Sequence, residues 1–98
     1  MNLNVHPVNF SPDDKLISLI EEKVKKLNIF NDTITSVDVY LKLEGSHAVR
    51  DKVVEIKVNV LKNQIFVKEQ TKTFEESLSI ALDSAISQLR KKKEILKG

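Results

Sequence analysis

Two stretches in the middle of the chain alternate apolar and polar residues one by one, the pattern of a β-strand with one buried face. In the first stretch one face carries Val37, Val39, Leu41 and Leu43. In the second, Val54, Ile56, Val58 and Val60 alternate with Glu55, Lys57 and Asn59. Such strands need cover on only one side. The pattern therefore predicts a sheet with one polar, open face and a single covering layer.

Two further strands flank this pair. Residues 2–10 alternate weakly, and Pro7 has no amide hydrogen for a ladder, so a short strand should end there or lie at an edge. Residues 44–52 form a polar connection. Lys62-Asn63 is a plausible tight turn because asparagine tolerates left-handed dihedrals. A last strand then runs from Ile65 to about Lys72.

The covering layer comes from two amphipathic helices. Ser11-Pro12-Asp13-Asp14 predicts the start of the first, with Ser11 as the cap. Its apolar face is Leu16, Ile17, Ile20, Val24 and Leu27, and Asn28, Asn31 and Asp32 stop it. Thr73-x-x-Glu76 is a capping-box pattern that predicts a second helix from about 74 to 97. Its apolar face is Phe74, Leu78, Leu82, Ala85, Leu89 and Leu96.

The predicted order is β-α-β-β-β-α in one domain of 98 residues. We expect an α+β two-layer sandwich, with a four-stranded mixed sheet and two helices packed on one face. The first helix allows the first two strands to be parallel neighbours, and the later strands should form an antiparallel meander.

Composition disfavours most catalytic functions. The chain has no cysteine and only two glycines, so thiolate sites and a glycine-rich phosphate loop are excluded. His6 and His47 lie 41 positions apart, and Ser46-His47 has no evident third partner. We predict no enzyme, no metal and no cofactor. No apolar run has the length of a membrane span and the start lacks a signal peptide, so a cytoplasmic location without membrane contact is expected.

Positive charge gathers at the end of the second predicted helix. The whole chain has a net charge of +2, whereas residues 90–98 carry five basic residues against Glu94. A helix of this length spans about 36 Å and a strand only about 25 Å, so the helix should project beyond the sheet. Lysines at a helix end also suit its dipole, but four basic residues in succession favour a polyanionic partner.

The first predicted helix adds Lys15, Lys23 and Lys26, which lie with Leu19 along one edge of its apolar face. If that edge faces the second helix, the two rows form a basic groove; the alternative is a solvated face balanced by Glu21 and Glu22. Only Tyr40 and Phe66 are expected on the open sheet face, so recognition of phosphates is a better mechanism than stacking. Lys52 and Lys62, expected in loops at strand ends, serve as controls.

Four segments resemble a known family: LNVHPVNFSPDDKLISLIEEKVKKL, VDVYLKLEG, KVVEIKVNV and KEQTKTFEESLSIALDSAISQLRKKKEILK. The chain resembles the short-form ribosome hibernation promoting factors, also called ribosome-associated inhibitor or sigma-54 modulation proteins. The resemblance implies the fold expected above. It also implies a non-enzymatic translation inhibitor that occupies the decoding cleft of the small ribosomal subunit, on 16S-type rRNA and ribosomal proteins. There it blocks messenger and transfer RNA and preserves idle ribosomes in stationary phase or stress.

The resemblance also implies rRNA-binding residues. Lys23 and Lys26 match basic positions of the family's first helix, and Arg90, Lys91 and Lys93 match the basic run after Gln88-Leu89; the run is extended by Lys92 and Lys97. Ser87 departs from a position where many relatives are basic. Residues 1–98 are expected to be a single ribosome-binding domain without the C-terminal dimerisation domain of longer members, and a monomer when free. The alternative is a protein-interaction module that modulates a transcription factor.

Overall fold

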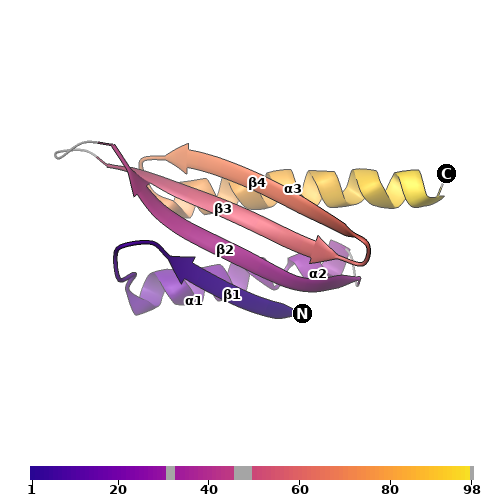
Figure 1. The fold of residues 1–98 in the computed structure, drawn as a ribbon, viewed down its shortest axis with the longest axis horizontal. Coiled ribbons are helices and arrows are strands. Elements are labelled where there is room, and N and C mark those ends of the chain that lie inside the picture. Colours follow the sequence, from indigo (N-terminus) through magenta and orange to yellow (C-terminus); the bar gives the residue numbers. More distant parts are fainter. Residues whose placement is uncertain (31–32, 46–49, 98) are drawn as a thin grey trace.

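The computed structural model describes residues 1–30, 33–45 and 50–97, with side chains described through residue 91 apart from Phe30. The chain forms one sheet and one layer of helices (Figure 1). The elements are β1 (Asn2–Pro7), α1 (Asp14–Val24), α2 (Leu27–Phe30), β2 (Ile34–Glu44), β3 (Asp51–Val60), β4 (Asn63–Thr71) and α3 (Phe74–Lys97).

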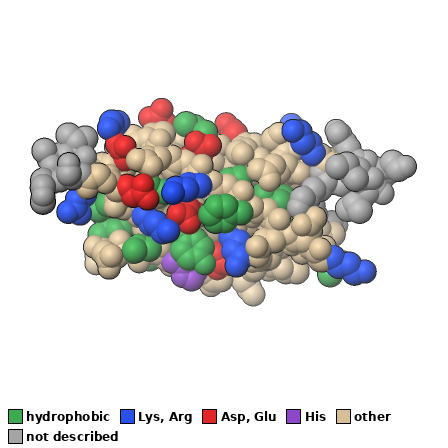
Figure 2. Space-filling model, turned by 45° about the horizontal axis from the view of Figure 1, so that its top comes forward, with side chains coloured by type: hydrophobic (Ala, Val, Ile, Leu, Met, Phe, Trp, Pro, Cys, Tyr) green, Lys and Arg blue, Asp and Glu red, His purple; other side chains and the backbone are tan. Residues whose placement is uncertain are grey.

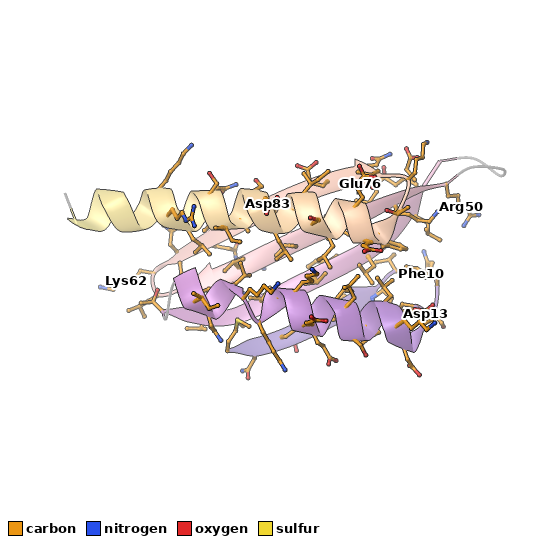
Figure 3. All side chains as sticks on the ribbon, turned by 180° about the vertical axis from the view of Figure 1, so that it is seen from behind. Phe10, Asp13, Arg50, Lys62, Glu76 and Asp83 are labelled. Atoms are coloured by element: carbon orange, nitrogen blue, oxygen red, sulfur yellow. The ribbon has the colours of Figure 1, made fainter. Side chains whose placement is uncertain are left out.

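The four strands lie in sequence order across the sheet. β1 is parallel to β2, and the pairs β2–β3 and β3–β4 are antiparallel. The helices lie behind the sheet in Figure 1 and in front of it in Figure 3, so they cover one face only. The predicted two-layer α+β sandwich with a mixed four-stranded sheet is therefore confirmed.

The core lies between the inward face of the sheet and the helices. From the strands it takes the predicted alternating residues Val37, Val39, Leu41, Val54, Ile56, Val58, Ile65 and Val67. From α3 it takes Leu78, Ala81, Leu82, Ala85 and Leu89. Burying a large aliphatic side chain contributes roughly 1.5–3 kcal/mol. Packing of this face therefore holds α3 in place far more strongly than helix propensity does.

α1 begins at a different cap from the one predicted. The carboxylate of Asp13 accepts the backbone N–H of Leu16 at 2.8 Å, and Asp13 itself has an extended backbone. The prediction of Ser11 as the cap is therefore wrong, because Pro12 lies outside the helix. A carboxylate caps as well as a hydroxyl, and its charge also suits the positive end of the helix dipole.

The first helix also ends earlier than predicted. α1 stops at Val24, two residues form a turn, and Leu27 opens the four-residue α2. The hydrogen bond from the Lys26 N–H to the Lys23 carbonyl, at 3.3 Å, is a tightened i→i−3 contact of the kind found at helix ends. Leu27 is still fully buried, so the break keeps the apolar row in the core. The predicted stop residues Asn31 and Asp32 lie outside the described residues.

The turn between β3 and β4 is shifted by one residue from the prediction. Val60 pairs with Asn63, so Leu61 and Lys62 form the turn. Lys62 has a φ of 63°, whereas Asn63 opens β4 and its side-chain oxygen accepts the N–H of Gln64 at 2.8 Å. The left-handed position therefore belongs to a lysine.

α3 begins as the capping pattern predicts. The hydroxyl of Thr73 accepts the N–H of Glu76 at 3.1 Å. The other half of the predicted capping box is replaced, because the Thr73 N–H donates to the Thr71 hydroxyl at 3.3 Å rather than to the Glu76 side chain. The helix has 24 residues, about 36 Å at 1.5 Å per residue. Its C-terminal part projects past the end of the sheet, which confirms the predicted overhang (Figure 1).

Candidate functional site

Three parts of the chain meet at one end of the molecule: the end of α1 with α2, the β3–β4 turn and the last turns of α3. The pairing of Ile34 with Val60 brings the chain that follows α2 beside the turn. Figure 3 shows Lys62 at this end of the sheet, with α3 continuing past it. We call this region the basic end, and among the described side chains it comprises Lys23, Lys25, Lys26, Lys62, Arg90 and Lys91.

The α3 part of the basic end starts directly after Leu89. Leu89 is fully buried, and the two residues that follow, Arg90 and Lys91, are exposed. Successive helical residues are 100° apart, so these two cations point to different sides. The backbone stays helical to Lys97. The predicted contacts Lys92, Lys93 and Lys97 therefore lie on the projecting helix, but their side chains are outside the described residues.

A groove beside α1 shows how this helix is oriented. Met1, Leu3 and Val5 of the N-terminal segment line this groove together with Ile17, Glu21 and Lys25. Ile17 and Glu21 of α1 and Lys25 directly after it therefore face the outer edge of β1. Lys23 and Leu19 lie on the opposite flank of α1, the flank toward α3. Lys15 shares that flank but sits in the first turn of α1, away from the basic end.

Helix dipoles do not account for the charge of the basic end. α1 and α3 run in the same direction, so both C-terminal ends point toward it (Figure 1). Two helix C-termini supply together about one negative charge. The basic end carries six described cations against Glu21 and Glu22 of α1, so its positive charges outnumber these two carboxylates and the helix dipoles together. The opposite end has mixed charge, because Asp13, Asp14, Glu75 and Glu76 at the helix starts lie at the same end as Lys15, Arg50, Lys52 and Lys72.

The open sheet face has a balanced charge. Figure 2 shows basic and acidic side chains interspersed there. The ammonium group of Lys42 lies 2.9 Å from the carboxylate of Glu55, and that of Lys68 lies 3.8 Å from Glu44. The Glu55 hydrogen bond raises the pKa of Lys42 above its ordinary value. Cations that are already paired add little field toward a phosphate.

A polar and aromatic cluster at the β1 edge of this face was not found by sequence reasoning. The ring of His6 stacks on Tyr40 with centroids 4.7 Å apart, and its Nε2 lies 3.0 Å from an Asp38 oxygen. Asn4 and Asn59 also donate to that carboxylate. Its hydrogen bond to His6 is the largest cause of the lowered pKa of Asp38. Only the parallel register of β1 on β2 creates this contact.

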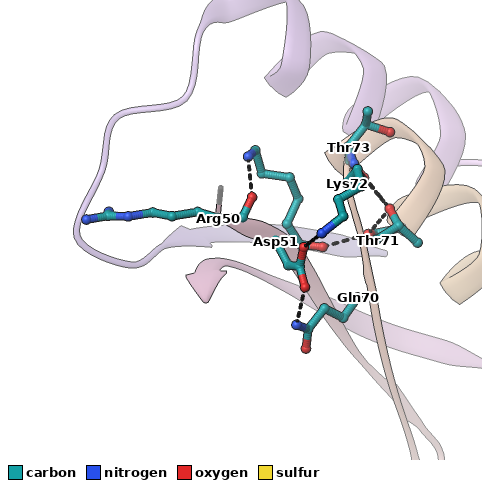
Figure 4. Close-up of polar contacts among 8 residues, drawn as sticks. Arg50, Asp51, Gln70, Thr71, Lys72 and Thr73 are labelled. Atoms are coloured by element: carbon teal, nitrogen blue, oxygen red, sulfur yellow. Dashed lines mark hydrogen bonds and ion pairs between the residues drawn. The ribbon is translucent and has the colours of Figure 1, made fainter. Parts of the chain in front are cut away.

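A second cluster missed by the sequence lies at the end of the sheet opposite the basic end (Figure 4). Asp51 forms an ion pair with Lys72 and accepts the amide of Gln70 at 2.8 Å. These bonds lower the pKa of Asp51, the one from Lys72 most. Lys52 lies in β3 rather than in the predicted loop, and its ammonium donates to the Arg50 carbonyl at 2.8 Å.

Potential metal ligands are scattered over the described part of the chain. There, no three His, Cys, Asp or Glu residues gather closely enough to hold a metal ion. Ser46 and His47 lie outside the described residues. No helix in the described ranges combines the length and the apolar character needed to cross a membrane.

Comparison with known proteins places the chain in a family. No curated protein matches it in sequence. Among solved structures it is similar to the Protein Y N-terminal domain of Thermus thermophilus, with a TM-score of 0.80 and 22% identity over 93% of this chain and 98% of the other. It is also similar to a ribosomal subunit interface protein from Coxiella burnetii, with a TM-score of 0.83 and 16% identity over 96% and 99% of the two chains. At these identities the two structures establish the shared fold.

A family model described as Sigma 54 modulation protein / S30EA ribosomal protein matches residues 3–97, nearly the whole sequence. The match includes both helices that carry the basic end and all four strands of the sheet. This chain therefore belongs to the Sigma 54 modulation protein / S30EA ribosomal protein family.

Proposed function

We propose that this protein is a ribosome-associated hibernation factor that binds the small ribosomal subunit through its basic end. It occupies the cleft between head and body, blocks messenger and transfer RNA there, and preserves idle ribosomes. Family membership supports the association with ribosomes. The single observation that carries the mechanism is the projection of α3, with exposed Arg90 and Lys91, beyond Leu89, the last buried residue among the described side chains of α3.

The shape of the molecule suits insertion into a cleft between RNA walls. Its longest extent is 50 Å, against 21 and 18 Å in the other directions. The helix ends that carry the cations of the basic end lie toward one end of this long axis (Figure 1). Ribosomal RNA presents closely spaced phosphates, so such a body is drawn in by its basic end while the balanced sheet face stays electrostatically neutral.

This proposal assigns a role in binding RNA to each predicted basic residue. Lys23 and Lys26 contact phosphate from the α1 side, and Arg90, Lys91 and Lys93 contact it from α3; Lys92 and Lys97 extend the same surface. No step of this function needs a cofactor, a metal or catalysis. The binding unit is the single domain of residues 1–98, acting as a monomer in the cytoplasm.

The test is direct binding to purified ribosomal subunits. The protein is sedimented through sucrose with small subunits, with large subunits and alone, at several salt concentrations. Co-sedimentation with small subunits, weakening steeply with salt by a log–log slope of about −0.7 to −0.9 per contact, supports the proposal. Release of a bound messenger fragment on addition of the protein supports occupancy of the cleft. Failure of the protein to sediment with small subunits at low salt overturns the proposed function.

The second candidate is a protein-interaction module that modulates a transcription factor. The observation that favours it is the open sheet face, where Phe66 remains 54% exposed beside paired charges. A face of this kind suits a protein partner better than a polyanion. Two results together would favour this candidate. The chain would bind a protein partner at high salt and lose that binding in Phe66→Ser, and it would not bind ribosomes.

A further inference from the structure

The turn between β3 and β4 places a lysine in an unfavourable backbone conformation. Lys62 has a φ of 63°, in the left-handed region that side chains with a Cβ avoid. Two-residue hairpin turns normally place glycine or asparagine at such a position. An asparagine is the next residue, yet the register puts it in β4. The chain therefore tolerates a strained lysine at the turn where a better residue stands one position away.

The turn residues do not serve the core. Leu61 is 69% exposed and Lys62 is exposed. Within the described residues, the Lys62 ammonium group makes no hydrogen bond or ion pair. This differs from Lys42, Lys68 and Lys72, each of which faces a carboxylate. Packing and internal pairing therefore give no reason for the lysine at this turn.

The turn lies level with the first exposed cations of α3. From Asn63 to Thr71, β4 covers about 26 Å at 3.3 Å per residue. α3 runs back along β4 from Phe74, and covers the same distance in about 17 residues at 1.5 Å each. It therefore passes the turn near Lys91. Figure 3 shows the same relation, with α3 continuing past the labelled Lys62.

We propose that Lys62 is a further contact to RNA phosphate, so that the sheet, and not only the helices, contributes to the basic end. This inference rests on the proposed function. The turn holds the unpaired ammonium group where the projecting part of α3 leaves the sheet, so one RNA backbone meets Lys62 and the Arg90-Lys91 pair together. The expectation that Lys62 is a neutral control is revised accordingly, whereas Lys52 lies at the other end of the sheet.

The experiment compares Lys62→Gln, Lys62→Asn and Lys62→Arg with wild type, in binding to purified small ribosomal subunits between about 50 and 200 mM salt. Lys68→Gln is the matched control, since it also removes one charge, but from β4 on the open face rather than from the turn that precedes this strand. Lys62→Gln should lower affinity about three- to ten-fold and flatten the log–log salt slope by about 0.7–0.9. Lys62→Arg should keep both.

The Lys62→Asn variant separates charge from backbone strain. Asparagine tolerates the left-handed region, so its melting temperature should rise while its affinity falls as in Lys62→Gln. Wild-type affinity and slope in Lys62→Gln, or an equal loss in Lys68→Gln, would overturn the inference while leaving the proposed function intact. If the wild-type protein does not bind small subunits at all, the proposed function fails and this inference fails with it.

Discussion

The hydroxyl of Ser77 in α3 donates a hydrogen bond to the backbone carbonyl oxygen of Lys52 in β3, over 2.7 Å. Ser77 is fully buried and is the only buried polar residue among the described side chains. Its oxygen also lies 2.7 Å from the hydroxyl of Thr71 in β4. One small side chain thereby ties the first turn of α3 to two strands and sets where the helix starts on the sheet.

Ser77→Ala should therefore destabilise the fold by about 1–3 kcal/mol, because the Lys52 carbonyl loses its partner in a place where water cannot replace it. Urea unfolding measures the change. Ser79→Ala is the matched control, two residues along the same helix but exposed; it should stay within about 0.5 kcal/mol of wild type. Equal effects of the two substitutions would contradict the structural role of the buried hydroxyl.

The start of α1 gives a prediction that separates two candidate caps. Asp13→Ala removes the acceptor of the Leu16 N–H and should lower the free energy of unfolding by about 0.5–2 kcal/mol. Ser11→Ala should change it by less than about 0.5 kcal/mol, because Ser11 lies before the helix. The measurement is again denaturant unfolding. A larger loss in Ser11→Ala than in Asp13→Ala would show that the hydroxyl caps the helix after all.

The strand pattern of this fold was predictable because period-two alternation has one interpretation when one face is buried. Val37 to Leu41 and Val54 to Val58 face the core as expected. The predictions that were wrong concern single residues at the ends of helices and strands. Asp13 and Ser11 are both good caps, and an asparagine at position 63 favours a turn that the register of Val60 shifts by one residue. Tertiary contacts select between such residues, and local propensities do not reveal which one is selected.

The candidate site was predictable in its helical part and not in its sheet part. The exposed cations Arg90 and Lys91 open a run of four basic residues directly after Leu89 of the apolar face, a signal visible in sequence. Lys62 carries no such signal, because its membership of the basic end depends on where α3 passes the β3–β4 turn. His6 against Tyr40 is a similar case, since their contact needs the parallel register of two strands.

The Asp51 cluster predicts a loss of stability in acid. The hydrogen bond from Lys72 holds the pKa of Asp51 below its ordinary value of 3.8. The charged carboxylate therefore stabilises the fold above that value, and the contribution is lost as the pH falls through the lowered pKa. Asp51→Asn should lower the melting temperature at pH 7, and its difference from wild type should shrink in that acid range.

Lys72→Gln is the companion variant for this prediction, since it removes the strongest cause of the lowered pKa. The acid limb of its stability curve should then begin at a higher pH than in wild type. Thermal melts from pH 7 down to about 3 measure both variants. An Asp51→Asn difference that stays constant across this range would contradict the role assigned to the ion pair.

The open sheet face should matter little for binding to ribosomes. Lys42 is paired with Glu55 at 2.9 Å, and Lys57 lies close enough to Asp38 to help lower the pKa of that carboxyl. Replacing Lys42 and Lys57 together by glutamine should change the affinity for small subunits less than about three-fold. The measurement is a binding titration at fixed salt. A loss as large as that caused by changes in α3 would contradict a neutral sheet face.

The projecting part of α3 should account for the largest share of the salt dependence of binding to small ribosomal subunits. Arg90 and Lys91 are exposed and follow the buried Leu89, so the triple variant Arg90→Gln, Lys91→Gln, Lys93→Gln should keep the wild-type melting curve. If each residue neutralises one phosphate, the log–log slope of affinity against salt should become shallower by about 2 to 3. Affinity should fall most at low salt, where counterion release contributes most.

The control for this triple variant removes three charges elsewhere: Lys15→Gln in the first turn of α1, with Lys57→Gln and Lys68→Gln on the open face. Both triple variants have the same net charge, so any difference between them reports position. The control should retain most of the wild-type slope. Equal slopes in the two variants would mean that total charge, rather than the basic end, draws the protein to RNA. A wild-type slope in the α3 variant would exclude these cations from the interface.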